Sequence, residues 1–192
     1  MTYTAKTFTL PTLEGLSEEQ VSVHLALYEG YVKHMNVISE ELEKLKEQGA
    51  NQYVINELRR RFSFEWNGAR MHEYYFTQFE GGPQNPTADS LLQKHAEKKY
   101  GSWDNFIAHI KEVAGSRGIG WVVVSLDETA DSLQTVWVSD HELGQLGGAK
   151  VILALDMWEH AFMVDYRPAK KNEYVEAFFN NLNWSVIENR VS

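Results

Sequence analysis

Residues 17–49, SEEQVSVHLALYEGYVKHMNVISEELEKLKEQG, predict one long helix. The run opens with a serine that can cap the first turn and two glutamates that favour the positive end of the helix dipole, and Gly49 can end it. Residues 51–78, NQYVINELRRRFSFEWNGARMHEYYFTQ, predict a second helical region with a break near Ser63 and Phe64. Two such helices joined by a short turn indicate an α-helical hairpin.

The chain after the hairpin predicts shorter elements. Residues 79–90, FEGGPQNPTADS, concentrate Gly, Pro, Asn and Ser, which is typical of a boundary between domains. The elements expected beyond it are helices at 90–101 and 102–115, strands at 120–128, 132–140 and 150–158, and terminal helices within 171–191. We therefore predict an α+β fold: a long N-terminal α-helical hairpin domain (1–84) packed on a C-terminal domain (85–192) with a three-stranded antiparallel sheet and several helices.

The composition excludes several classes of function. The 192 residues carry a formal net charge of −9, which argues against a nucleic-acid binder, and include no cysteine, which excludes disulfides, thiolate catalysis and iron–sulfur clusters. No apolar stretch approaches the roughly 20 residues that cross a bilayer, and the N-terminus does not resemble a secretory signal. We expect a cytoplasmic protein in which His, Asp or Glu must hold any metal.

Seven histidines are candidate ligands, although a single histidine in an apolar stretch is more often an ordinary core residue. Three have settings that favour a function. His24 and His72 lie among apolar residues of the two predicted long helices, and His160 follows Asp156 by four residues in 155–166, LDMWEHAFMVDY. The histidines in amphipathic patterns typical of surface positions are His34, His95 and His109.

The spacing of these residues leaves two interpretations open. His24 and Tyr31 are seven residues apart, so they share one face of a regular helix, and Asp156 and His160 can aim at one point if the chain turns between them. Three imidazoles and one carboxylate suit iron or manganese, whereas zinc is less typical of this set. The alternative is a buried element that carries an Asp and a His without any metal.

The run DMWEHAF at residues 156–162 resembles the C-terminal signature of the iron/manganese superoxide dismutases. Other segments resemble the same family in the same order, so that the resemblance covers nearly the whole chain. These segments are FTLPTLEGLSEEQVSVH, YVKHMN, GGPQNPTADSLLQKHAEKKYGSWDNF, GIGWVVV, VSDHE and YVEAFFNNLNW.

The resemblance implies a metal site between the two domains. Its ligands are expected to be His24, His72, Asp156 and His160, which together hold one iron or manganese ion per chain with a water or hydroxide as fifth ligand. The implied activity is superoxide dismutation, with superoxide as the small-molecule substrate. Two alternatives remain: another non-haem iron or manganese oxidase or peroxidase on the same fold, and a non-enzymatic member of the family.

The resemblance also implies roles for residues around the metal. Tyr31 matches the tyrosine at the substrate funnel, and Glu159 matches a residue that crosses to the partner's fourth ligand in a homodimer or a dimer of dimers. His141 is expected to fill space left by Gly68 and to act on the metal-bound solvent; the alternative is a surface histidine at the end of a strand. The expected aromatic shell is Tyr75, Trp121 and Trp158.

Three departures from the family pattern carry expectations of their own. The family usually has one more residue between the positions of His24 and Tyr31, so we expect a straighter helix here. Tyr28 and Met163 stand where the family commonly has a His and a Tyr that gate the funnel across the subunit interface, so this gate should be altered or absent. The lysines expected to replace a funnel arginine in attracting superoxide are Lys170 and Lys171.

Overall fold

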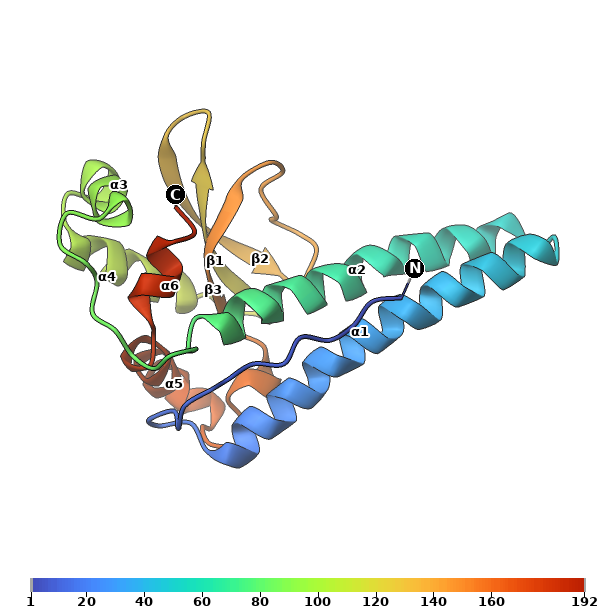
Figure 1. The fold of residues 1–192 in the computed structure, drawn as a ribbon, viewed down its shortest axis with the longest axis horizontal. Helices are drawn as coiled ribbons and strands as arrows, with labels where there is room; N and C mark the ends of the chain where they lie inside the picture. The colour runs from blue at the N-terminus through green and yellow to red at the C-terminus, as the bar shows by residue number, and fades with distance from the viewer. Residues whose placement is uncertain (1, 192) are drawn as a thin grey trace.

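The computed structural model describes residues 2–191 and begins with a long antiparallel helical hairpin (Figure 1). Helix α1 spans Glu18–Glu47 and helix α2 spans Gln52–Thr77. Each helix starts at a polar cap, because the side chains of Ser17 and Asn51 accept hydrogen bonds from backbone N–H groups of the first turn. The N-terminal segment runs along the hairpin and is held there by hydrogen bonds to side chains of α1.

Both long helices are regular over their whole length. Helix α1 contains no wider or tighter turn, which confirms the straighter helix expected from the spacing of His24 and Tyr31. The break expected near Ser63 and Phe64 is wrong, since α2 is continuous through both residues. The Ser63 hydroxyl bonds the Arg60 carbonyl within the same helix, so this serine is accommodated without leaving the helical conformation.

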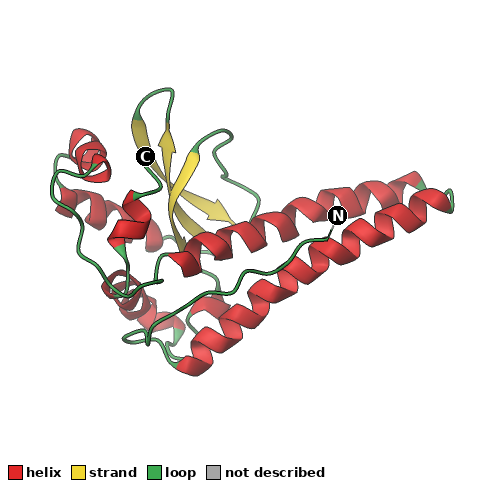
Figure 2. Cartoon of the chain, in the orientation of Figure 1, coloured by secondary structure: helices red, strands yellow, loops and turns green. Residues whose placement is uncertain are grey.

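The second half of the chain builds a small sheet covered by short helices (Figure 2). The sheet has the order β2-β1-β3, and both pairings are antiparallel. The elements are α3 (Leu91–Tyr100), α4 (Trp103–Ala114), β1 (Gly120–Asp127), β2 (Ser132–Ser139), β3 (Lys150–Asp156), η1 (Glu159–Ala161), η2 (Pro168–Lys170), α5 (Lys171–Asn180) and α6 (Trp184–Glu188). The predicted α+β class is confirmed, whereas the domain division at residue 84 stays a prediction.

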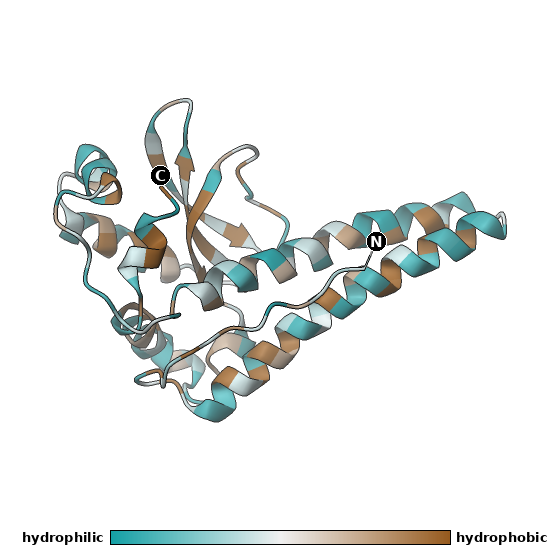
Figure 3. Ribbon diagram, in the orientation of Figure 1, coloured by the Kyte–Doolittle hydropathy of each residue, from teal (hydrophilic) through white to brown (hydrophobic). Residues whose placement is uncertain are grey.

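The hydrophobic core lies where the hairpin meets the sheet. The central strand β1 is buried over nearly all of its length, and the last five residues of β3 are buried as well. Figure 3 shows apolar residues concentrated along these strands, while polar and apolar residues alternate along the outer part of the hairpin. Among residues 2–191, no helix is both long and apolar enough to cross a membrane.

One buried amide joins the hairpin to the sheet. Strand β3 lies at an edge of the sheet, so its outer backbone groups need partners from elsewhere. The Gln78 side chain, at the end of α2, donates to the Ala154 carbonyl at 2.8 Å and accepts from the Ala154 N–H at 2.9 Å. Gln78 therefore takes the place of a neighbouring strand and fixes the end of α2 against β3.

Replacement of this amide should weaken the fold. Gln78→Leu keeps a similar volume but leaves two buried backbone groups of Ala154 without partners, which we expect to lower the free energy of unfolding by about 2–5 kcal/mol. Urea unfolding followed by circular dichroism measures the change, and Gln52→Leu at the exposed start of α2 is the matched control. A loss below about 1 kcal/mol would show that Ala154 finds other partners.

Candidate metal centre

Four side chains from four different elements converge at the junction of the hairpin and the sheet. His24 comes from α1, His72 from α2, Asp156 from the end of β3, and His160 from η1. Their potential ligand atoms all lie within 4.8 Å of one another. Asp156 is central, because its Oδ2 lies 2.9 Å from Nε2 of His24, 3.3 Å from Nε2 of His160 and 3.5 Å from Nε2 of His72.

The imidazole of His72 presents a lone pair to this point. His72 Nδ1 lies 2.6 Å from the Gly68 carbonyl, which can only accept, so Nδ1 carries the proton and Nε2 faces the cluster unprotonated. Nε2 of His72 and Nε2 of His160 are buried and have no hydrogen-bond partner among the described residues. Unpaired buried nitrogen atoms are costly unless something binds them, so the cluster fits a metal ion.

Electrostatics around the cluster also suit a cation. Burial lowers the pKa of His24 and lowers that of His72 well below its usual value, so both imidazoles are neutral near pH 7. Burial alone would raise the pKa of Asp156, but the adjacent His160 and His24 outweigh it and hold that pKa well below its usual range. Three imidazoles around one carboxylate can hold a divalent or trivalent first-row metal.

Asp156 is oriented by two further contacts. Its Oδ1 accepts the backbone N–H of Trp158 at 2.8 Å, which leaves Oδ2 to face the imidazoles. The Tyr174 hydroxyl donates to the Asp156 carbonyl at 2.7 Å and fixes the strand end. Sequence reasoning missed Tyr174, although its spacing of three and four residues from Ala177 and Phe178 puts it on the apolar face of α5 and could have marked it as a buried hydroxyl in need of a partner.

A hydrogen-bonded chain leads from the sheet toward the cluster. Trp121 Nε1–H donates to Nδ1 of His141 at 2.9 Å, and because indole can only donate, the His141 proton must lie on Nε2. That Nε2–H donates to the Tyr31 hydroxyl at 2.8 Å, so the Tyr31 O–H remains available for another acceptor. Burial lowers the pKa of His141 to about 4, and burial also raises the pKa of Tyr31, so both groups are neutral near pH 7.

His141 is fully buried, so the alternative of a surface histidine at a strand end is wrong. The space beside Gly68 is occupied by Tyr31 rather than by His141, which corrects a detail of the sequence prediction. A Cβ at position 68 would lie 2.7 Å from Tyr31 Cδ1. Glycine on α2 thus lets the ring from α1 approach the α2 backbone, and the ring in turn delivers its hydroxyl to His141.

The predicted aromatic residues surround the cluster. Trp121 packs on His72 with ring centroids 5.0 Å apart, and Tyr75 packs on His24 at 4.8 Å. Trp158 stacks on both His141 and His160, at 4.9 and 5.5 Å. The residues that sequence reasoning missed are Phe64, which packs on His141, Phe76, which packs on His24, and Gln20, whose side chain bonds the His160 carbonyl and the Val164 N–H.

Of the residues expected at the gate, Tyr28 stacks on His72 with ring centroids 6.4 Å apart, whereas the lysines expected to attract superoxide lie apart from the cluster. Tyr28 is fully buried and its hydroxyl accepts from the Lys6 N–H at 2.7 Å, so it faces its own chain. Met163 is 45% exposed. Lys170 pairs with Glu173 on the surface and Lys171 donates to the Ser116 carbonyl, so neither lysine contacts a residue of the cluster. Glu159 is exposed beside His160.

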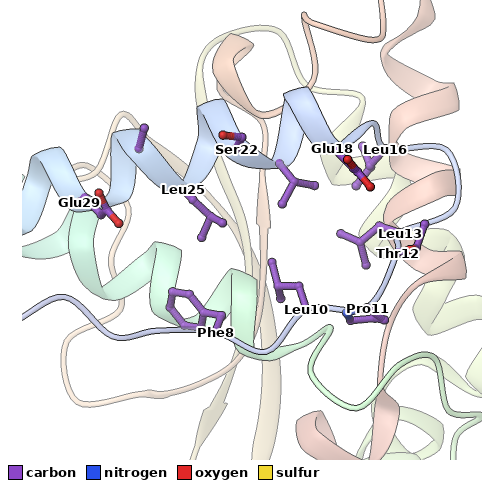
Figure 4. Close-up of a pocket in the computed structure, with 12 residues that line it drawn as sticks. Phe8, Leu10, Pro11, Thr12, Leu13, Leu16, Glu18, Ser22, Leu25 and Glu29 are labelled. Carbon is purple, nitrogen blue, oxygen red and sulfur yellow. The ribbon is translucent and has the colours of Figure 1, made fainter.

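A groove of about 580 Å³ lies away from the cluster of candidate ligands, between the N-terminal segment and α1 (Figure 4). Its walls are partly apolar and partly polar: Phe8, Leu10 and Leu25 turn toward one another, and the carboxylates of Glu18 and Glu29 lie along α1. None of the cluster residues lines it. Volume therefore does not identify the site in this protein; the convergence of ligand atoms does.

Comparison with known proteins agrees with the geometry. Residues 88–190 match the family profile described as iron/manganese superoxide dismutases, C-terminal domain. The chain therefore belongs to the iron/manganese superoxide dismutase family.

Its relatives include iron superoxide dismutases from three distant organisms. The protein of Cupriavidus metallidurans is 36% identical over 90% of this chain and 86% of the relative. That of Aquifex pyrophilus is 33% identical over 93% of this chain and 85% of the relative. That of Methanothermobacter marburgensis is 30% identical over 91% of this chain and 87% of the relative. The similarity thus extends over nearly the whole chain and includes the hairpin that the family profile does not cover.

The close approach of Tyr31 to Gly68 can be tested by adding one methyl group. Gly68→Ala should push the Tyr31 ring away and cost about 1–3 kcal/mol of the free energy of unfolding, together with part of the activity. Gly30→Ala is the matched control on α1, because a Cβ there meets no atom within 4 Å and should be neutral or stabilising by up to about 1 kcal/mol. Equal effects of the two substitutions on stability would contradict the packing described here.

Proposed function

We propose that this protein is a superoxide dismutase whose metal ligands are His24, His72, Asp156 and His160. The observation that carries the proposal is the convergence of three imidazole nitrogen atoms on Asp156 Oδ2, with two of those nitrogen atoms buried and unpaired. Membership of the family and similarity to iron superoxide dismutases support the reaction. The cofactor we propose is one iron or manganese ion per chain with a water or hydroxide beside it, and the relatives favour iron.

When bound, the metal would supply the redox chemistry, taking an electron from one superoxide to release dioxygen and giving it to a second superoxide, which leaves with two protons as hydrogen peroxide. The protein's part is to fix the ligands and to manage protons. The Gly68 carbonyl and the Trp158 N–H orient His72 and Asp156, so the donor atoms are in place before any ion arrives.

Tyr31 and His141 are the residues we assign to proton handling. His141 donates to the Tyr31 oxygen, which leaves the tyrosine proton free to be donated to an oxygen species at the cluster. The Trp121 N–H holds His141 in the tautomer that makes this direction possible. Because both groups are neutral near pH 7, they can pass a proton without first gaining one from bulk solvent.

The activity and the ligand set are tested together. Purified protein loaded with iron or manganese should accelerate superoxide decay, and His160→Ala should lose its metal and lower that rate by more than about a hundredfold. His109→Ala, a histidine outside the cluster, should keep both metal and activity. Metal analysis and a superoxide decay assay provide the readouts; a His160→Ala protein that retained full metal content would disprove the ligand assignment.

A homodimer, or a dimer of dimers, is the assembly we propose. The side chain of His160 is 16% exposed, and metal-binding histidines usually donate through their second nitrogen to a carboxylate or carbonyl. Glu159 of a second copy could supply that acceptor. The surface of the same region also carries exposed apolar side chains, namely Val23, Leu27, Met163 and Val164.

Removal of the proposed acceptor should weaken the dimer. Glu159→Ala should raise the dimer dissociation constant by about tenfold or more, since it removes a charge-assisted hydrogen bond at an interface. Sedimentation velocity over a concentration series measures this constant, with Glu128→Ala on an exposed turn as the control. Unchanged association of the Glu159→Ala protein would rule out this bridge.

Two further roles belong to the same proposal. Lys170 and Lys171 would act through the local positive charge that they add to a chain of net charge −9 rather than through contact with substrate, because neither reaches the cluster.

We also propose that the protein is located in the cytoplasm, and fractionation of cells that express the protein would test this location.

A further inference from the structure

A small basic pocket lies on the side of α2 that carries Arg70 and Glu73. Its volume is about 210 Å³, which is below the size of a typical pocket for a drug-sized ligand. One face of α2 presents Arg70, Glu73 and Thr77 at helical spacing, whereas His72 of the same helix belongs to the cluster of candidate metal ligands. The lining residues are Lys6, Arg70, Glu73, Tyr74, Thr77 and Arg190.

The single carboxylate of this basic pocket is already saturated. Glu73 accepts from both Arg70 and the Tyr28 hydroxyl through Oε1, at 2.7 and 3.2 Å. Its Oε2 accepts from Arg70 at 2.8 Å and pairs with Lys6 Nζ at 2.9 Å. Three cationic side chains and one anionic side chain leave a formal charge of +2 in a chain whose net charge is −9.

Arg190 is the cation whose charge is least compensated. Its guanidinium donates only to neutral acceptors: the carbonyls of Ile152 and Tyr74, the Thr77 hydroxyl and, at 3.3 Å, the Gln78 side chain. These contacts close the outer edge of β3 and the last turn of α2, where the helix dipole offsets part of the charge. No carboxylate among residues 2–191 pairs with Arg190.

Two of the three cations, Arg70 and Lys6, also retain unused donors. Arg70 uses one guanidinium nitrogen for Glu73 and lies over the Trp66 ring at 4.5 Å, and its side chain is 38% exposed. The Lys6 side chain is 56% exposed and makes one ion pair. A flexible ammonium and a planar guanidinium group beside a small hollow are donors that proteins use for tetrahedral anions, and Arg190 adds a third positive charge at the same place.

We propose that this basic pocket binds a phosphate group, either as free phosphate or at the end of a small phosphate monoester. A phosphate near neutral pH carries a charge of about −1.5 to −2, which matches the excess charge of the pocket. The pocket contains none of the four proposed metal ligands, so this binding is independent of the dismutase proposal.

Isothermal titration calorimetry of the metal-loaded protein with inorganic phosphate tests the proposal, with sodium chloride at matched ionic strength as the blank. We expect saturable binding that Lys6→Gln and Arg70→Gln each weaken by about tenfold. Lys94→Gln, which removes an exposed lysine of α3 that forms no ion pair with any of residues 2–191, should bind phosphate like the wild type. A parallel titration with glycerol phosphate distinguishes a preference for monoesters from one for the free ion.

Two results would overturn the proposal. One is the absence of saturable binding of both phosphate and glycerol phosphate. The other is equal binding by wild type, Lys6→Gln and Arg70→Gln, which would place the anion elsewhere, for example at the metal. Circular dichroism of each variant verifies that it is folded, and unchanged superoxide decay rates in both variants would confirm that the pocket is separate from the metal centre.

Discussion

The buried carboxylate of Asp156 is the constraint on which the rest of the structure depends. A fully buried anion is tolerated only when neighbouring groups stabilise its charge. Around the two carboxylate oxygens of Asp156 these groups are three imidazoles and one backbone N–H. Those imidazoles come from the hairpin and from η1, so the carboxylate also dictates how the two halves of the chain meet.

The arrangement that surrounds Asp156 follows from a few close fits. Gly68 admits the ring of Tyr31, the ring positions a hydroxyl, and Trp121 selects the tautomer of His141 that can reach it. The regularity of α1 contributes as well, because Tyr31 follows His24 by seven positions, about two helical turns, and so lies on the same face. Directional hydrogen bonds and the absence of one Cβ thus organise the region beside the cluster.

Local patterns predicted most of the fold. Helix caps, glycine stops and β-branched runs indicated the hairpin and the three strands, and the run at 156–162 indicated residues that the structure brings together with His24 and His72. The predicted break at Ser63 was wrong because that serine bonds a carbonyl of its own helix, and local sequence does not reveal this choice. The contact of Gln78 with Ala154 and that of Gly68 with Tyr31 were not predicted, because each joins segments that are distant in the sequence.

The separation of the ligands along the chain has a consequence for how the protein matures. His24 and Asp156 are 132 residues apart, so an ion held by both would close a very large loop, much as a crosslink does. The N-terminal helices can be synthesised and can pair before β3 exists, but they provide only two of the four donors. If all four proposed ligands hold the ion, it can bind them together only after η1 has been synthesised, and it would then link the two ends of the chain against unfolding.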